Sequence, residues 1–417
     1  MEGLPPEFSR LIESCGINAL TINEYLNAMR KEITLSISYK KITIKSLAYL
    51  SKFLSNKKFK KMQKNDIGSF LDSKRKSEVA DPLHSWIASY NLYIVILTRF
   101  FKWLYYPDLP AKERSKPVCV QIPKLRRKEQ SVYKPTDLWT QDDDLLFLKY
   151  CSSKRDRCYH AISRDSSCRP HELLNLKIKD VIFKNAGDRQ YAEILVNGKT
   201  GQRHIPLINS IPYLKDLLDN HPRYGNPDAN LICGFDKSLG QPIRINTINH
   251  IYSQYKNKIF PRLLEDTKVP SEDKEKIREL LKKRWNPYVR RHSALTEKSK
   301  ILKESILRQH AGWSPISSMH QKYIHYFGNE SSESILEAYG LKPKLEELNK
   351  LKPIACPNCS ELNKIDSKFC FKCRMILSYD AYSEAKQDSE IQKSKIDSLQ
   401  LKFEQLENEF KKNKISK

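Results

Sequence analysis

One predicted β-hairpin in a chain of otherwise helical pattern limits the folds that this sequence can adopt. Residues 191–196 and 203–208 have the composition of strands, and the Asn197-Gly198 pair between them is typical of a tight turn joining antiparallel strands. Most other regular segments place apolar residues every three or four positions, which is the period of a helix. We therefore expect an α+β protein that is mainly helical.

The N-terminal part of the chain is predicted to be a small helical bundle with a basic face. Residues 17–106 have helical periodicity, with many lysines between the apolar positions. The stretch 107–135 instead combines prolines with closely spaced lysines and arginines, and both disfavour a packed core. We expect a helical domain over 1–110 and a basic, proline-containing linker over 111–135.

The charge of the chain indicates a polyanionic partner. A formal net charge of +25 and a pI near 9.5 in 417 residues favour nucleic acid, although a basic protein with a solvated lysine coat is an alternative.

The longest apolar run, around residues 90–104, is interrupted by Arg99 and Lys102, so we expect no membrane span. Six of the ten cysteines are scattered among predicted helices and strands, which fits a reducing compartment. We expect a cytoplasmic protein that associates with the nucleoid when bound to DNA.

Two arginines lie where proline marks a predicted helix start, and both are suited to hold an anion. Arg169 and Arg291 would each present a permanently charged fork that matches two phosphate oxygens, and N–H groups at a helix start add to an anion site. Glu172 could orient Arg169 or cap its helix. Because neighbouring side chains point about 100° apart on a helix, we expect at most one of Arg290 and Arg291 to face such a site.

Three further residues complete a set suited to phosphoryl transfer. Tyr323 is the candidate nucleophile, provided that nearby cations stabilise its oxyanion, since the pKa of a free phenol is about 10. Lys199 is a flexible candidate proton donor for the leaving oxygen, and the indole N–H of Trp313 can bond a phosphate oxygen. Each residue alone fits an ordinary structural role. Their joint order indicates phosphoryl transfer without metal or nucleotide.

Two cysteine pairs near the C-terminus are predicted to bind a structural zinc ion. Each pair has the spacing Cys-x-x-Cys, and ten residues separate the pairs, which are Cys356 with Cys359 and Cys370 with Cys373. Four thiolates on two turns suit tetrahedral zinc in a closed site; a redox pair is the alternative. We expect a zinc ribbon over 353–377 and a C-terminal helix over 380–417, which could form a coiled coil.

Four segments resemble the sequence boxes of the tyrosine recombinases, also called the phage integrase family. The first-arginine box, the catalytic-lysine hairpin, the second-arginine box and the tyrosine box are matched by Ser163–Leu176, Gly198–Leu207, Pro287–Thr296 and Gly312–Tyr323 followed by Ile335–Gly340. The last match is similar to archaeal-type integrases, in which tryptophan takes the histidine position. The resemblance covers residues 17–340 and is strong from residue 160 onward.

The resemblance implies a site-specific DNA recombinase that integrates or excises a mobile element. A core-binding domain over 1–110 and a catalytic domain over 136–345 would clamp double-stranded DNA, and a homotetramer would form on it. Tyr323 would attack a phosphate to give a 3′-phosphotyrosyl link and a free 5′-hydroxyl. A second strand would then reverse the step through a Holliday junction. By the same resemblance, neither a metal nor ATP would take part in this catalysis.

The implied site departs from the family at one position. By resemblance the catalytic residues are Arg169, Lys199, Tyr288, Arg291, Trp313 and Tyr323, with Glu172 and His292 in support. The family usually has histidine where this chain has Tyr288. A phenol can hydrogen-bond a phosphate oxygen but is a poorer proton acceptor than imidazole near neutral pH. His292 could compensate, although helix packing is the commoner role for such a histidine.

Other classes of protein fit part of this pattern. A chromosome-dimer-resolving recombinase shares the chemistry, and so does a type IB topoisomerase, which the helical N-terminal domain and the short hairpin fit less well. A DNA-binding regulator that has lost catalysis is the alternative from a different class. In that interpretation Tyr288, in place of the usual histidine, would be the first catalytic residue to have been lost.

Overall fold

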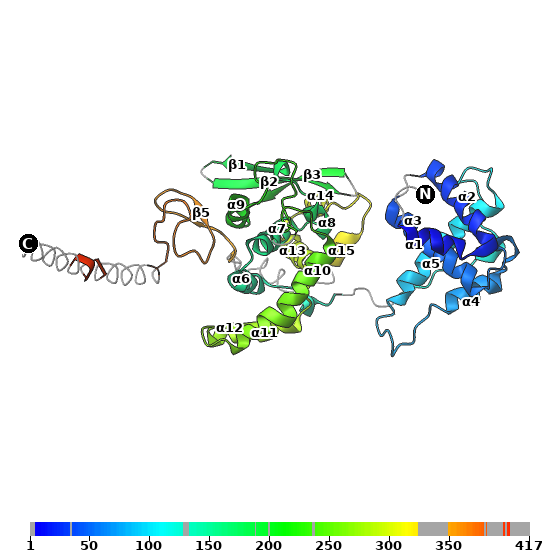
Figure 1. The fold of residues 1–417 in the computed structure, drawn as a ribbon, viewed down its shortest axis with the longest axis horizontal. Helices are drawn as coiled ribbons and strands as arrows, with labels where there is room; N and C mark the ends of the chain where they lie inside the picture. The colour runs from blue at the N-terminus through cyan, green and yellow to red at the C-terminus, as the bar shows by residue number, and fades with distance from the viewer. Residues whose placement is uncertain are drawn as a thin grey trace, which may run out of the picture. The chain divides into compact units, whose positions relative to one another are not determined.

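Two units make up the chain, Met1–Val132 and Tyr133–Lys417, and each has its own hydrophobic core (Figure 1). The computed structural model describes residues 5–33, 36–127, 133–187, 189–198, 201–235, 238–323, 349–378, 381, 395–396 and 398–400. The described residues of both units are mainly helical, which confirms the predicted α+β class. The division into five segments made from the sequence remains a prediction.

The described residues of the first unit form a bundle of five α-helices around an aromatic core. The helices are α1 Pro6–Glu13, α2 Ala19–Glu32, α3 Ile37–Phe53, α4 Lys64–Asp72 and α5 Trp86–Tyr105. Phe100 of α5 packs edge-on against Tyr25 of α2 and against Phe59, with ring centroids 5.1 and 4.8 Å apart. All three rings are buried, so the aromatic stripe predicted for this region is core.

The segment expected to be a linker packs against the bundle over much of its length. Cys119 and Val120, in the short helix η3 (Val118–Val120), are buried in the core of the first unit. Arg114, only 6% exposed, forms an ion pair of 2.6 Å with Glu32. The prolines and cations of this stretch do not prevent packing, because apolar residues between them pack against α4 and α5. Residues 128–132 lie outside the described part.

The second unit surrounds a three-stranded antiparallel sheet with helices. Its elements are α6 Gln141–Tyr150, α7 Lys154–Ser166, α8 Pro170–Leu174, β1 Val181–Ala186, β2 Arg189–Gly198, β3 Gly201–Leu207, α9 Ile211–Asp219, α10 Ile245–Gln254, α11 Phe260–Glu265, α12 Ser271–Lys282, α13 Pro287–Ile301, α14 Glu304–Ala311, α15 Met319–Gln321, β4 Ile354–Ala355 and β5 Leu362–Asn363. The sheet order is β1-β2-β3, and α7, α8, α9 and α14 lie along one side of it (Figure 1).

The hairpin is present, but its turn is not where the sequence indicated. Asn197 and Gly198 belong to strand β2, and Gly198 pairs with Gly201. The connection therefore falls at residues 199–200, outside the described part, and so does the candidate Lys199. A Cβ atom at Gly198 would lie 2.5 Å from Oε1 of Glu172. The glycine is needed for this close approach, and this is why a turn signal appears inside a strand.

Helix α7 forms the centre of the second unit, and residues 158–166 are all buried. Oδ2 of Asp165, near the end of α7, accepts hydrogen bonds from the backbone N–H groups of Ile208, Asn209 and Ser210 at 2.6, 2.8 and 3.0 Å. This carboxylate fixes the end of β3 against α7. Arg169 follows α7 and Arg203 lies in β3, so this contact joins the two elements that carry these arginines.

Two predictions fall largely outside the described residues. Of the C-terminal helix expected over 380–417, the described residues are 381, 395–396 and 398–400, and all are helical. The motif Ile335–Gly340 is not among them. No helix in the described ranges is both long and apolar enough to cross a membrane.

Candidate active site

Arg169 and Glu172 form one local motif at the start of α8. Helix α7 ends at Ser166, and the C-cap residue Ser167, with φ of 54°, turns the chain; Arg169 is the N-cap residue of α8, with Pro170 in its first turn. Oε2 of Glu172 accepts from the backbone N–H of Arg169, and Oε1 accepts from its Nη1, both at 2.8 Å. Glu172 therefore caps the helix and orients the guanidinium, the two roles considered for it from the sequence.

Arg203 is a third arginine of the site, and the sequence analysis did not select it. Its Nη2 donates to Oε2 of Glu172 at 2.8 Å, and its Nε donates to the carbonyl of His310 at 3.1 Å. Burial alone would raise the pKa of the Glu172 carboxyl, but hydrogen bonds from Arg203 and Arg169 lower that pKa to about 2. One fully buried carboxylate thus lies between two guanidinium groups.

Arg291 lies beside Arg169, and the adjacent Arg290 points elsewhere. Arg290 is fully buried, pairs with Asp144 of α6 and lies 4.9 Å from the ring centroid of Trp139. Nη1 and Nη2 of Arg291 donate to the carbonyls of Ser167 and Ala311 at 2.5 and 2.7 Å. Burial, followed by the charge of Arg169, lowers the pKa of Arg291 to about 10, so it is protonated at neutral pH.

The turn after α14 holds the arginines in place. Nη2 of Arg169 donates to the carbonyl of Gly312 at 3.0 Å, next to the Ala311 carbonyl that Arg291 uses. Gly312 ends α14 with a left-handed φ of 64°, and a Cβ atom there would lie 2.7 Å from Nη1 of Arg203. A side chain at this position would therefore both strain the backbone and displace Arg203.

The charge of this arginine cluster (Arg169, Arg203 and Arg291) is not balanced within it. Glu172 is the carboxylate that binds Arg169 and Arg203, and Arg291 is bound by uncharged carbonyls. The cluster with Glu172 therefore has a net charge of +2. The side chain of Arg169 is 22% exposed, which leaves it accessible to an anion. Guanidinium groups in this setting suit the oxygens of a phosphate.

Tyr323 lies next to the arginine cluster and hydrogen-bonds His292. Its hydroxyl is 2.8 Å from Nδ1 of His292, and its ring stacks on Trp313 with centroids 5.4 Å apart. Burial raises the pKa of Tyr323 to about 12, while the charges of Arg291 and Arg169 oppose the increase. Burial, with Arg291, lowers the pKa of His292 to about 4, so the imidazole is neutral at neutral pH and can accept a proton.

The structure thus brings together most of the residues selected from the sequence. The residues that meet are Arg169, Glu172, Arg291, His292, Trp313 and Tyr323. Tyr288 lies in the first turn of α13, one turn before His292, and 40% of it is exposed. In the described part of the chain its hydroxyl makes no hydrogen bond to the other candidates. The roles of all these residues stay predictions.

A signal for Arg203 is present in the sequence. In β3, Arg203, Ile205 and Leu207 point to the same face, and the two apolar residues are fully buried. Strand alternation therefore places the Arg203 side chain on the buried face, where a charge needs a partner. The alternation of β3 therefore predicts a buried arginine that needs an acidic partner, and Glu172 is that partner.

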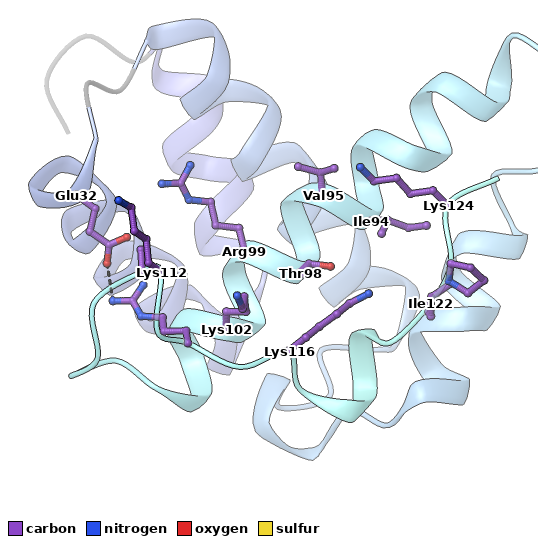
Figure 2. Close-up of a pocket in the computed structure, with 13 residues that line it drawn as sticks. Glu32, Ile94, Val95, Thr98, Arg99, Lys102, Lys112, Lys116, Ile122 and Lys124 are labelled. Atoms are coloured by element: carbon purple, nitrogen blue, oxygen red, sulfur yellow. Dashed lines mark hydrogen bonds and ion pairs between the residues drawn. The ribbon is translucent and has the colours of Figure 1, made fainter. Parts of the chain in front are cut away.

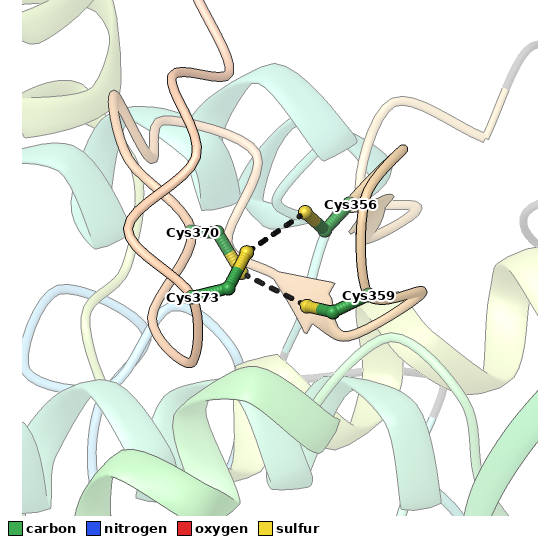
Figure 3. Close-up of side chains that lie close together, drawn as sticks. All are labelled: Cys356, Cys359, Cys370 and Cys373. Carbon is green, nitrogen blue, oxygen red and sulfur yellow. Dashed lines mark hydrogen bonds between the residues drawn. The ribbon is translucent and has the colours of Figure 1, made fainter.

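The four cysteines form a cluster that fits a zinc ion. Their sulfur atoms all lie within 4.8 Å of one another, with Cys356 3.5 Å from Cys373 and Cys359 3.6 Å from Cys370 (Figure 3). Sulfur atoms about 2.3 Å from a central zinc in a tetrahedron would be about 3.8 Å apart, close to these distances. The donor set and its spacing are therefore compatible with the predicted structural site.

The cysteine module (residues 353–377) contacts the rest of the second unit through α9. Glu361 and Lys364, which flank strand β5 of the module, form ion pairs with Lys215 and Asp216 of α9. Lys350, just before the module, pairs with Asp142 of α6 at 2.8 Å. The sequence had left open what the module touches, and one of its sides contacts α9.

The chain is similar to solved structures of integrases and recombinases. No family model matches the sequence, and no curated protein matches it. A lambda integrase dimer bound to a core site is 14% identical, with a TM-score of 0.49, over 79% of this chain and 83% of that one. The recombinase XerH in a post-cleavage complex is 18% identical, with a TM-score of 0.48, over 80% of this chain and 94% of that one. The Tn1549 transposon integrase in complex with transposon right end DNA is 14% identical, with a TM-score of 0.49, over 77% of this chain and 99% of that one.

These similar structures belong to proteins of the kind whose sequence boxes the chain resembles. Identities below 20% and TM-scores below 0.5 leave the chemistry of this chain to be inferred from its own residues.

Proposed function

We propose that this protein is a tyrosine-type site-specific DNA recombinase that cleaves and rejoins DNA through Tyr323. One observation carries the proposal: a buried tyrosine hydroxyl, bonded to a neutral histidine, lies beside a cluster of arginines with excess positive charge. A phosphodiester resists attack because its negative charge repels nucleophiles, and fixed guanidinium groups counter that repulsion. The same cluster stabilises the charge that develops on the phosphate oxygens.

The reaction is an exchange of one phosphodiester bond for another. The Tyr323 oxygen forms a bond to phosphorus, and the bond from phosphorus to the 5′-oxygen breaks, leaving a 3′-phosphotyrosyl link. Arg169 and Arg291 hold the non-bridging oxygens, and Lys199, a prediction from the sequence, gives the 5′-oxygen a proton. Attack by a 5′-hydroxyl on the phosphotyrosine reverses every step. The bond energy is kept in the covalent link, so the cycle needs no ATP.

His292 is the residue that receives the phenol proton in this scheme. Its Nδ1 is 2.8 Å from the Tyr323 hydroxyl, within reach for direct transfer. The pKa of Tyr323 is about 12 and that of His292 about 4, so transfer before attack would cost on the order of 10 kcal/mol. The proton therefore leaves as the bond to phosphorus forms, when the phenol oxygen becomes more acidic.

Tyr288 has a different role in the proposal from the histidine that the family usually has there. It lies one turn from His292 on the same helix, and its side chain is 40% exposed. We infer that it donates a hydrogen bond to a phosphate oxygen and takes no part in moving protons. His292 supplies the proton acceptor that a phenol cannot supply near neutral pH.

The first unit contains a basic groove suited to a DNA backbone. A groove of about 710 Å³ lies between α5 and residues 111–124 (Figure 2). Its cationic lining residues are Arg99, Lys102, Lys112, Arg114, Lys116 and Lys124. The acidic residue in the lining, Glu32, is already paired with Arg114. We propose that DNA phosphates bind here, and that the cysteine module holds a structural zinc ion.

A second candidate function follows from Tyr288. If a histidine is essential at that position, the chain would be a sequence-specific DNA-binding protein with impaired catalysis. Resolution of chromosome dimers is the alternative role within the same chemistry. Integration by an archaeal-type enzyme remains a prediction from the motifs.

Trapping a covalent intermediate separates these functions. Nicked duplexes tiled across the DNA that flanks the gene would lose the short 5′-hydroxyl strand on cleavage, which prevents rejoining. The proposal expects a protein–DNA adduct with the natural chain and none with Tyr323→Phe, which keeps the ring and removes the nucleophile. DNA binding without any adduct would instead support the impaired protein. Relaxation of supercoiled DNA without a special site would identify a topoisomerase.

A further inference from the structure

The outer cysteine knuckle carries a surface that the proposed recombination chemistry does not use. This outer knuckle (residues 368–375) has six exposed residues around its two cysteines, namely Lys368, Phe369, Phe371, Lys372, Arg374 and Met375. Phe371 is 54% exposed and Met375 44% exposed, high values for large apolar side chains in a small module. Three cations and three apolar side chains are thus exposed together within eight residues.

The module has two chemically different sides. Its two carboxylates lie on the side toward the other helices of the unit: Glu361 pairs with Lys215 of α9, and Asp366 lines a groove with residues of α6, α9 and α12. Residues 367–378 contain three cations and no acidic residue. The side toward α9 is therefore occupied by ion pairs, while the outer knuckle is entirely cationic and apolar.

The outer knuckle is held rigidly, so its exposed groups are presented in a fixed arrangement. Asn363 is 1% exposed; its Oδ1 accepts from the backbone N–H of Phe371 at 2.7 Å, and its Nδ2 lies 3.7 Å from the sulfur of Cys370. Arg374 follows the second cysteine in a left-handed conformation, with φ of 63°. Glycine adopts this conformation at a lower cost than any other residue. The chain nevertheless has an arginine at this position, and its charge is exposed.

We propose that the outer knuckle is a DNA-contacting surface separate from the active site, and this inference rests on the proposed function for its DNA partner. Lys372 and Arg374 would bind phosphates, and Phe371 would lie against sugars or base edges in the minor groove. Phosphates are the partner that the charge favours, because residues 367–378 contain three cations and no acidic residue to balance them. A small apolar group flanked by cations matches a nucleic acid backbone and the groove beside it.

The test measures binding of the full-length, zinc-loaded protein to a short fluorescent duplex over a range of salt concentrations. Log affinity falls with log salt, and each lost phosphate contact reduces the steepness of this fall by about 0.9. The double variant Lys372→Gln/Arg374→Gln is expected to reduce the steepness by about 2. Phe371→Ala is expected to weaken binding at least about fivefold without changing the slope. Zinc content and melting temperature show whether each variant is folded.

A charge-matched control separates the outer knuckle from general electrostatics. Lys276→Gln/Lys282→Gln on α12 removes the same charge from lysines that are 48% and 70% exposed. An equal fall in slope for both double variants, or no fall for the knuckle variant, overturns the inference. A photo-crosslinking residue in place of Phe371 gives a second measurement. It should link to the duplex, and a link to a second copy of the chain overturns the inference.

Failure of this inference can be distinguished from failure of the proposed function. If the Tyr323 adduct forms while the knuckle variants bind DNA like the natural chain, the inference is wrong and the recombinase proposal stands. If the salt slope falls as expected but no adduct forms with any flanking duplex, the knuckle contacts DNA and the proposed catalysis is wrong.

Discussion

Replacing Glu172 by glutamine should destabilise the second unit strongly. The carboxylate is fully buried and accepts hydrogen bonds from both Arg169 and Arg203. Glutamine has nearly the same shape, but it carries no charge and directs an N–H group toward one of the guanidiniums. The change leaves the three-arginine cluster without its carboxylate, which raises the net charge of this site from +2 to +3.

The size of the effect follows from the pKa of Glu172. Its carboxyl has a pKa of about 2 in the folded protein, against 4.5 for an unperturbed glutamate. A difference of this size corresponds to about 3 kcal/mol of stability, present at neutral pH. Because the folded-state pKa is the lower one, the contribution is lost as pH falls from about 4.5 toward 2. The gap between natural and variant proteins should narrow over the same pH interval.

Urea unfolding followed by tryptophan emission, at neutral pH and at about pH 3, measures this gap. We expect Glu172→Gln to lower the free energy of unfolding by about 3 kcal/mol at neutral pH and by much less in acid. The control Glu275→Gln, at an exposed position on α12, should change it by no more than about 0.5 kcal/mol. A loss below about 1 kcal/mol at neutral pH, or one independent of pH, would refute the role given to Glu172.

Three further predictions concern other parts of the second unit. Gly312→Ala should abolish adduct formation and lower the melting temperature, because its Cβ would lie 2.7 Å from Arg203; normal activity would show that the turn is free to shift. His292→Ala should slow adduct formation by about 10²- to 10⁴-fold while DNA binding stays unchanged. An unchanged cleavage rate would remove the proton-acceptor role. Native mass spectrometry should find one zinc ion per chain, and a chelator should make all four module cysteines reactive to alkylation; a metal-free folded module would contradict the site.

The sequence selected most of the residues that meet in the candidate site, but it did not predict the contacts that hold them. Arg169 and Arg291 were selected because they lie at proline-marked helix starts, and a helix start is a local signal. The sequence motif favoured Arg291 over Arg290, but the physical reason lies in the fold, since Asp144, which binds Arg290, is far away in the chain. The bond between His292 and Tyr323 joins residues 31 positions apart, and no local pattern reports such a contact.

Two features of the sequence have signals with more than one physical cause. Asn197-Gly198 is a turn signature, but Gly198 is glycine because Glu172 lies against it. The stretch after Pro107 is basic and rich in proline, and this composition is typical of a linker. The stretch also contains Cys119 and Val120, which are buried and pack it against the first unit. In both cases tertiary packing decided the structure, and composition alone could not reveal the partner.

The most direct test of the account is to identify the residue that joins DNA. After trapping with a nicked duplex from the flanking DNA, the adduct is digested with protease and nuclease and sequenced by mass spectrometry. The account predicts a nucleotide on Tyr323, bound through a 3′-phosphate, and no such peptide from Tyr323→Phe. An adduct on another residue, or a 5′-phosphate link, would contradict the assignment of Tyr323 as the nucleophile.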